Sequence, residues 1–71
     1  KEIDFIAIAG NDKIYYQVAA SVLDPDTFKR EVAPLKLIAD HFPKVILTLD
    51  DYPMSEDGIK QQNIVEFLLG Q

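Results

Sequence analysis

The stretch Glu2–Ser21, EIDFIAIAGNDKIYYQVAAS, decides the fold of this chain because it predicts a β-hairpin. Two runs rich in isoleucine, valine, phenylalanine and tyrosine flank the polar break at residues 10–13. Glycine, asparagine and aspartate tolerate the positive φ that tight hairpin turns need. We therefore expect strands over residues 3–9 and 14–20, joined by a turn at Asn11 and Asp12.

The register of the hairpin follows from which side chains can be buried together. With Asn11 and Asp12 at the turn, one face is wholly apolar and sets large residues opposite small ones, pairing Ala9 with Ile14, Ala7 with Tyr16, Phe5 with Val18 and Ile3 with Ala20. A slip by one residue would mix polar and apolar side chains on both faces. We therefore expect Tyr16 in the core and Tyr15 partly exposed.

The other face of the hairpin carries the candidate metal ligands. The expected register sets Asp4 directly across from Ala19 and diagonal to Gln17, with Glu2 at the open end. Magnesium prefers oxygen ligands, so Asp4 with Glu2 is the best candidate metal site. The first strand also carries isoleucines on this face, and a strand that is apolar on both faces is usually central. We therefore expect a further strand beside it.

Length and composition indicate one small domain over residues 1–71, with an apolar share of 48% that is typical of globular proteins. A core of this size contributes only about 3–5 kcal/mol to the free energy of unfolding when no disulfide or metal ion adds to it. The chain has no cysteine, which excludes disulfides and thiolate zinc sites. It begins at Lys1, without an initiator methionine and almost directly with a strand, which we interpret as a fragment of a longer, N-terminally truncated chain.

The net charge of −5 argues against a broad phosphate-binding surface, because nonspecific nucleic-acid affinity comes from lysine and arginine. Only Lys29, Arg30 and Lys36 lie close enough in sequence to form a local basic patch. The sequence shows no secretory signal and no apolar run of about 20 residues that would span a membrane. We therefore expect a cytoplasmic protein without a membrane partner.

The middle of the chain predicts a helix over residues 25–42. Asp24 is a good N-cap, and Pro25 fits the first helical position. Pro34 removes one hydrogen bond and clashes with the preceding turn, so we expect a kink, or a break and restart, near residues 31–34. Pro43 ends the helix.

The last third predicts a parallel strand, a polar loop, and a short C-terminal strand and helix. Residues 44–49, KVILTL, indicate a buried strand that a right-handed crossover makes parallel to residues 14–20. Residues 50–58 form the loop, and residues 58–62 a short edge strand. Asn63 and Glu66 resemble a capping box before a helix that Gly70 ends.

The order of these segments resembles the C-terminal domain of a large group of prokaryotic AAA-type ATPases. The resemblance covers nearly all 71 residues, through the segments EIDFIA, YYQVAAS, RE, PLKLI, DHFPKVILTLD, DGI and NIVEFLLG. It implies a restriction-endonuclease-like α/β fold, represented here by a ββαβ core whose first helix and strand would precede Lys1. ATP would bind an upstream module, since Gly10, Gly58 and Gly70 cannot make a GxxxxGK(S/T) loop.

The hairpin itself resembles that of PD-(D/E)XK nucleases, in which an aspartate and a glutamate hold a divalent metal and a lysine lies beside the attacking water. Asp4 matches the aspartate, Gln17 stands at the glutamate position and Ala19 at the lysine position. Gln17 offers only a neutral carbonyl oxygen, and no other residue of the motif replaces the lost cation. We therefore expect a vestigial catalytic site, with magnesium at Glu2 and Asp4 as the alternative.

Three other groups of polar residues have simpler interpretations. His41 lies near a helix end without a partner at metal-ligand spacing. The acidic residues of the loop do not match a calcium loop and predict a solvated segment: Asp50, Asp51, Glu56 and Asp57. Ser21 and Ser55 lack a placed base for nucleophilic catalysis.

Three functions follow as hypotheses. The first is a non-catalytic accessory or recognition domain of a prokaryotic ATPase, with the upstream ATPase module and a further protein as partners. The second is a metal-dependent nuclease with a drifted active site. The third is a domain that only completes the fold of the ATPase. We expect no catalysis from this chain alone, and the acidic charge disfavours nucleic acid as a partner.

Overall fold

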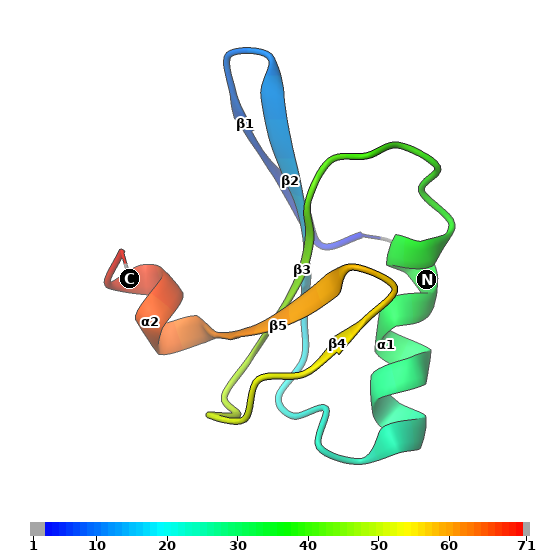
Figure 1. Cartoon of the computed structure of the whole chain (residues 1–71). Coiled ribbons are helices and arrows are strands. Elements are labelled where there is room, and N and C mark those ends of the chain that lie inside the picture. Colours follow the sequence, from blue (N-terminus) through cyan, green and yellow to red (C-terminus); the bar gives the residue numbers. More distant parts are fainter. Residues whose placement is uncertain (1–2, 71) are drawn as a thin grey trace.

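A computed structural model describes residues 3–70, which form a five-stranded mixed sheet and two helices (Figure 1). The sheet order is β1-β2-β3-β5-β4, in which β2, β3 and β5 are parallel and β1 and β4 are antiparallel edges. This confirms the expected small α/β domain and the parallel strand that follows the helix. The elements are β1 (Phe5–Ala9), β2 (Asp12–Val18), α1 (Pro25–Lys36), β3 (Lys44–Thr48), β4 (Ser55–Glu56), β5 (Ile59–Asn63) and α2 (Ile64–Leu68).

The hairpin forms as predicted, but it turns one residue earlier. Its turn lies at Gly10 and Asn11, and Gly10 takes a φ of 62°. Glycine at the first central position of a two-residue turn favours this placement over Asn11 and Asp12. The ladder therefore pairs Phe5 with Tyr16, so the expected register is wrong. Because the pairing moves by two residues, every side chain stays on its predicted face.

The main core lies between α1 and one face of the sheet. Tyr15 is only 7% exposed and belongs to this core, so the expectation that it is partly exposed is wrong. The apolar stripe of α1 packs on this face against Ile46 of β3 and Ile59 of β5. The cluster comprises Tyr15, Val22, Phe28, Val32, Leu35, Ile46 and Ile59.

The opposite face is covered only in part, by α2 (Figure 1). Phe67 packs against Tyr16 and Phe5, with ring centroids 5.0 and 6.4 Å away. Phe5 also stacks on Tyr16 at 4.8 Å. Tyr16 is buried, as predicted, whereas Phe5 and Val18 remain 39% exposed. The face expected to be the principal core is therefore the less covered one.

The helix α1 begins as predicted and ends earlier. The Asp24 side chain caps it by accepting from the Thr27 N–H at 3.0 Å. The helix runs through Pro34 without a restart and ends at Lys36, so the expected extent to residue 42 is wrong. Pro34 lies in the last turn, where it has no N–H to donate to the Arg30 carbonyl oxygen and so weakens the end of the helix. Residues 37–43 form an irregular connection instead.

The C-terminal part keeps the predicted elements in a different arrangement. The β5 strand lies between β3 and β4, so the expectation of an edge strand there is wrong, and the expected polar loop contributes β4. Asn63 caps α2 as predicted, accepting from the N–H groups of Val65 and Glu66 at 2.9 and 3.1 Å. Gly70 follows the helix with a φ of 80°, as a C-terminal stop requires.

The first strand is an edge of the described sheet. Within residues 3–70, β2 is the only strand that pairs with β1, so the expected central position is not found in this part of the chain. Neither described helix is long and apolar enough to cross a lipid bilayer.

Candidate functional site

The predicted site residues lie at the end of the hairpin that is farther from its turn. Continuing the register one residue beyond the Phe5–Tyr16 pair sets Asp4 across from Gln17, and not across from Ala19 as expected. Asp4 and Gln17 therefore share one face, as predicted, but they lie directly across from each other and not diagonally. Glu2, the second candidate ligand, lies outside the described residues.

The Asp4 carboxylate has a structural partner in the hairpin. Its Oδ2 accepts a hydrogen bond from the Val18 N–H at 2.8 Å. The β1 strand starts only at Phe5, so the backbone ladder has no acceptor for this N–H. The Asp4 carboxylate accepts from this N–H in place of a backbone carbonyl group, because side chains pair with backbone donors where strand pairing stops. Asp4 thus contributes to the hairpin whether or not it binds a metal.

Gln17 is the most unusual polar residue of the described chain. It is completely buried, and neither its Oε1 nor its Nε2 has a hydrogen-bond partner within residues 3–70. In the sheet it lies beside Ile46, a core residue. A buried amide without hydrogen-bond partners destabilises the folded state by about 1–3 kcal/mol, so Gln17 is an unfavourable residue in a core.

The third motif position is apolar. Ala19 packs against the core cluster and supplies no charge. Among residues 3–70, no group of three histidine, cysteine, aspartate or glutamate side chains is placed to hold a metal ion. Magnesium at Glu2 and Asp4 therefore stays a prediction.

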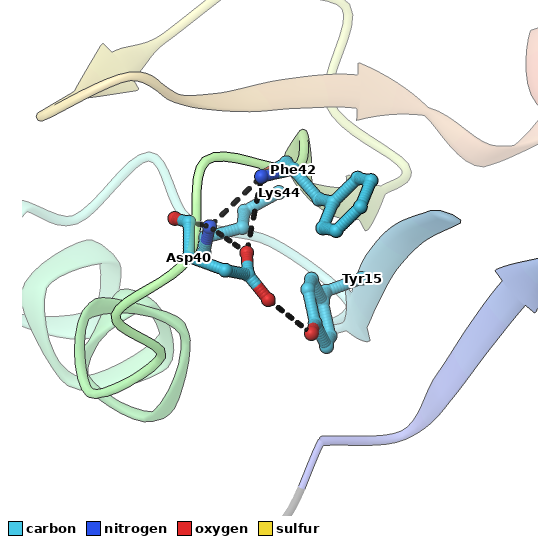
Figure 2. A network of polar contacts seen from close by, with 4 residues as sticks. All are labelled: Tyr15, Asp40, Phe42 and Lys44. Carbon is cyan, nitrogen blue, oxygen red and sulfur yellow. Dashed lines mark hydrogen bonds and ion pairs between the residues drawn. The ribbon is translucent and has the colours of Figure 1, made fainter. Parts of the chain in front are cut away.

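A polar network that the sequence did not reveal joins the irregular connection after α1 to the sheet (Figure 2). The Tyr15 hydroxyl donates to Asp40 Oδ2 at 2.5 Å, and the Phe42 N–H donates to Asp40 Oδ1 at 3.0 Å. The Tyr15 hydroxyl, followed by Lys44 and the Phe42 N–H, lowers the pKa of Asp40 to about 2. In the sequence, Asp40 stands two residues before Phe42, a spacing that suits an Asx turn.

Lys44 completes this network and has no donor left for a ligand. Its Nζ lies 3.1 Å from Asp40 Oδ1, and it donates to the carbonyl oxygens of Asp40 and Phe42 at 2.9 and 2.8 Å. An ammonium group has three donors, and these contacts use all of them. Figure 2 shows the four side chains converging between the connection and β2. The network therefore holds residues 37–43 against the sheet, and its role is structural.

Two neighbouring hollows border the network, with volumes of about 220 and 400 Å³. Both are lined by Asp40, Lys44 and Asp57. Lys36 also lines the smaller one, where it forms ion pairs with Glu56 and, at 3.2 Å, with Asp57. The hydrogen bond to Glu56, and then that to Asp57, raises the pKa of Lys36. The charged side chains that line the smaller hollow thus form ion pairs with one another or with Glu56.

The three residues of the predicted basic patch have different environments. Lys36 is engaged by the two acidic residues, while Lys29 and Arg30 are exposed on α1. Arg30 Nη2 also donates to Thr27 Oγ1 at 3.4 Å. Two surface cations on one helix are a weak basis for nucleic-acid binding in an acidic chain.

The acidic loop contains one residue that is not solvated, contrary to expectation. Asp50 is only 9% exposed and accepts from the Val22 N–H at 2.7 Å and the Ser21 hydroxyl at 2.8 Å. These bonds, the first of them foremost, lower the pKa of Asp50. Gln61 donates to the Asp50 carbonyl oxygen at 2.9 Å. Asp50 therefore joins the segment after β2 to β3 and β5.

The remaining candidates have no catalytic arrangement. His41 is exposed and stacks on Phe42 with the ring centroids 4.8 Å apart. The Ser21 hydroxyl donates to Asp50 and has no imidazole beside it among its described contacts. Ser55 lies on β4 and is exposed.

Comparison with known proteins adds no relative. No family model, no curated protein and no solved structure matches the chain. The class that the structure defines is therefore a small α/β domain with a five-stranded mixed sheet. The restriction-endonuclease-like fold and the resemblance to AAA-type ATPases stay predictions.

Proposed function

We propose that the protein is a non-catalytic interaction domain that works as an accessory to an ATPase. The environment of Gln17 is the observation that carries this proposal. An amide that is fully buried beside Ile46, with no polar partner in the described chain, offers no open coordination position to a hydrated ion. The chemistry of a metal nuclease needs a metal ion held beside a positioned charge.

The two flanking positions support the same proposal. Asp4 Oδ2 is engaged by the Val18 N–H, and the methyl group of Ala19 packs into the core. In a working site of this kind, both positions would present charge to the substrate. Of the three matching positions, only Asp4 carries a charge.

Exposed apolar side chains on β1 and α2 favour a protein partner. Ile8, Leu68 and Leu69 are each about two-thirds exposed or more, at 73, 73 and 68%. Phe5 and Ile6 are 39 and 46% exposed. Large exposed apolar side chains of this kind are candidates for contact with a partner protein.

A magnesium titration of the ¹⁵N-labelled protein tests the proposal. We expect no saturable shift of the Asp4 and Val18 amides at millimolar Mg²⁺. Amides of the exposed Asp51 and Asp57 report nonspecific ion binding and serve as the internal control.

A metal-dependent nuclease is the second candidate, favoured by the adjacency of Asp4 and Gln17 in the sheet. Saturable Mg²⁺ shifts at Asp4 and Val18 in the unmodified protein would support it. Magnesium-dependent cleavage of duplex DNA that Asp4→Asn abolishes would establish it and overturn the proposal of a non-catalytic domain.

A further inference from the structure

The two edges of the sheet differ in how well they are protected. The β4 edge has two residues, Ser55 and Glu56, and Glu56 pairs with Lys36. The β1 edge has five residues, FIAIA, and all of them are exposed. Natural sheets protect their edges with short strands, charges, prolines or bulges. The described β1 has none of these protections, so its edge is suited to pairing with another strand.

The direction of the backbone groups shows which residues of β1 face outward. The N–H groups of Tyr15 and Ala19 donate toward β3, to Pro43 and Leu47 at 3.0 Å each. By alternation, the N–H groups of residues 14 and 16 point toward β1, where their partners are Ala7 and Phe5. The N–H and C=O groups of Ile6 and Ile8 therefore point to the open edge.

The side chains of the same two residues are available as well. Ile6 is 46% and Ile8 is 73% exposed. A strand added to this edge would bond to their backbone and pack its own side chains against them. This is the usual mode of strand addition, in which main-chain bonds give affinity and alternate side chains give specificity.

The charges near the edge indicate what the added strand must carry. The exposed carboxylates of Asp4 and Asp12 flank β1 at its two ends. Among residues 3–70, Lys13 is the cross-strand neighbour of Ile8, and its ammonium group lies over the rings of Tyr15 and Phe42 at 5.4 and 5.2 Å. With a net charge of −5 on the chain, basic residues at the ends of the partner strand would complement the edge.

A second copy of the chain fits this edge less well. Symmetric antiparallel pairing about Ala7 would bring Asp4 of each copy to the turn of the other, close to Asp12. The exposed side chains of Ile6 and Ile8 cannot supply the roughly 800 Å² per partner that a stable interface buries. Like charge and small area both argue against a homodimer and in favour of a weak, reversible complex with a basic segment.

We propose that β1 binds, by strand addition, an extended segment of a partner protein that has apolar side chains at alternate positions and lysine or arginine at its ends. This inference rests on the proposed function as an interaction domain and names the surface and the partner chemistry. The partner strand lies along Ile6 and Ile8 and extends the sheet.

A peptide titration followed by NMR tests the inference. The probe is a short synthetic peptide of alternating isoleucine and threonine with lysines at both ends. We expect saturable shifts centred on the Ile6 and Ile8 amides. A peptide with glutamates in place of the lysines should bind about tenfold more weakly, because it meets the acidic ends of β1.

Two variants and one control locate the binding surface. Ile8→Lys places a charge on the edge and should weaken binding about tenfold. Ile8→Pro removes an N–H that points outward, so the hairpin remains and binding is lost. Leu37→Lys makes the same change in charge at a leucine that is 85% exposed on the helix end, and should bind as the unmodified protein does.

Three results would overturn the inference. One is the absence of saturable shifts at Ile6 and Ile8. Another is equal affinity for the lysine and glutamate peptides. The third is sedimentation of the protein alone as a dimer that Ile8→Lys dissociates, which would assign the edge to a second copy. The magnesium titration at Asp4 and Val18 decides the proposed function separately, so failure of one proposal is distinguishable from failure of the other.

Discussion

Replacing Gln17 by methionine should stabilise the protein. The Gln17 side chain is fully buried, and both its polar atoms lack partners within the described chain. Methionine has nearly the same length and shape without the amide. The substitution removes an unmet desolvation cost of about 1–3 kcal/mol. Imperfect fit of a similar apolar side chain offsets less than about 1.5 kcal/mol of this gain.

The net expectation is therefore a gain of about 1 kcal/mol in the free energy of unfolding. Urea denaturation followed by circular dichroism measures it. A small domain has an m-value of about 1 kcal/mol per molar urea, so the midpoint should rise by about 1 M. The slope itself should not change, since the same surface is exposed on unfolding.

Gln61→Met is the matched control, because Gln61 lies on the same face of the sheet beside Ile46. Its Nε2 donates to Thr48 Oγ1 at 2.8 Å and to the Asp50 carbonyl oxygen at 2.9 Å. The same substitution there removes two real hydrogen bonds and should destabilise by about 1–3 kcal/mol. A loss of stability in Gln17→Met comparable to that in Gln61→Met would refute the reasoning, since it would mean that the Gln17 amide has a partner.

Other predictions concern the two aspartates that the sequence did not single out as structural. Asp50→Ala leaves the Val22 N–H without its acceptor and should lower the free energy of unfolding by about 1–3 kcal/mol, measured by urea denaturation; an unchanged midpoint would contradict the assignment. Asp40 has a pKa of about 2, below the ordinary value of 3.8, so its stabilising contribution is present above pH 3.8 and is lost as the pH falls toward 2. Tyr15→Phe removes the largest cause of this shift, so an NMR titration should show the pKa of Asp40 rise toward 3.8; an unchanged value would assign the shift to other groups.

The sequence predicted the elements whose signals are local. The caps at Asp24 and Asn63 depend on a side chain and the backbone a few residues away, and both formed as expected. The parallel strand after the helix followed from its apolar run and the crossover rule. The stop at Gly70 followed from the positive φ that glycine allows.

Features that depend on distant parts of the chain were predicted less well. The turn could form at Gly10 and Asn11 or at Asn11 and Asp12. Both registers place the same side chains on each face of the hairpin, so the pattern does not distinguish them. The burial of Tyr15 depends on which face of the sheet α1 covers, and the sequence of the hairpin alone does not indicate this. The bond from Tyr15 to Asp40 joins residues 25 positions apart, and no pattern in either segment indicates it.

The sequence predicted the face of the hairpin on which the candidate site residues lie, and only partly their environment. Strand alternation correctly set Asp4 and Gln17 on one face. It could not show that Gln17 is fully buried or that Asp4 accepts the Val18 N–H, because both depend on where β1 starts and on what packs over the sheet.

Paramagnetic broadening by Mn²⁺ tests the central claim most directly, namely that the hairpin holds no catalytic metal. We predict that substoichiometric Mn²⁺ broadens the amide signals of Asp4, Val18 and Ala19 no more than those of the exposed Asp51 and Asp57. Selective broadening of Asp4, Val18 and Ala19, reversed by Asp4→Asn, would contradict the claim.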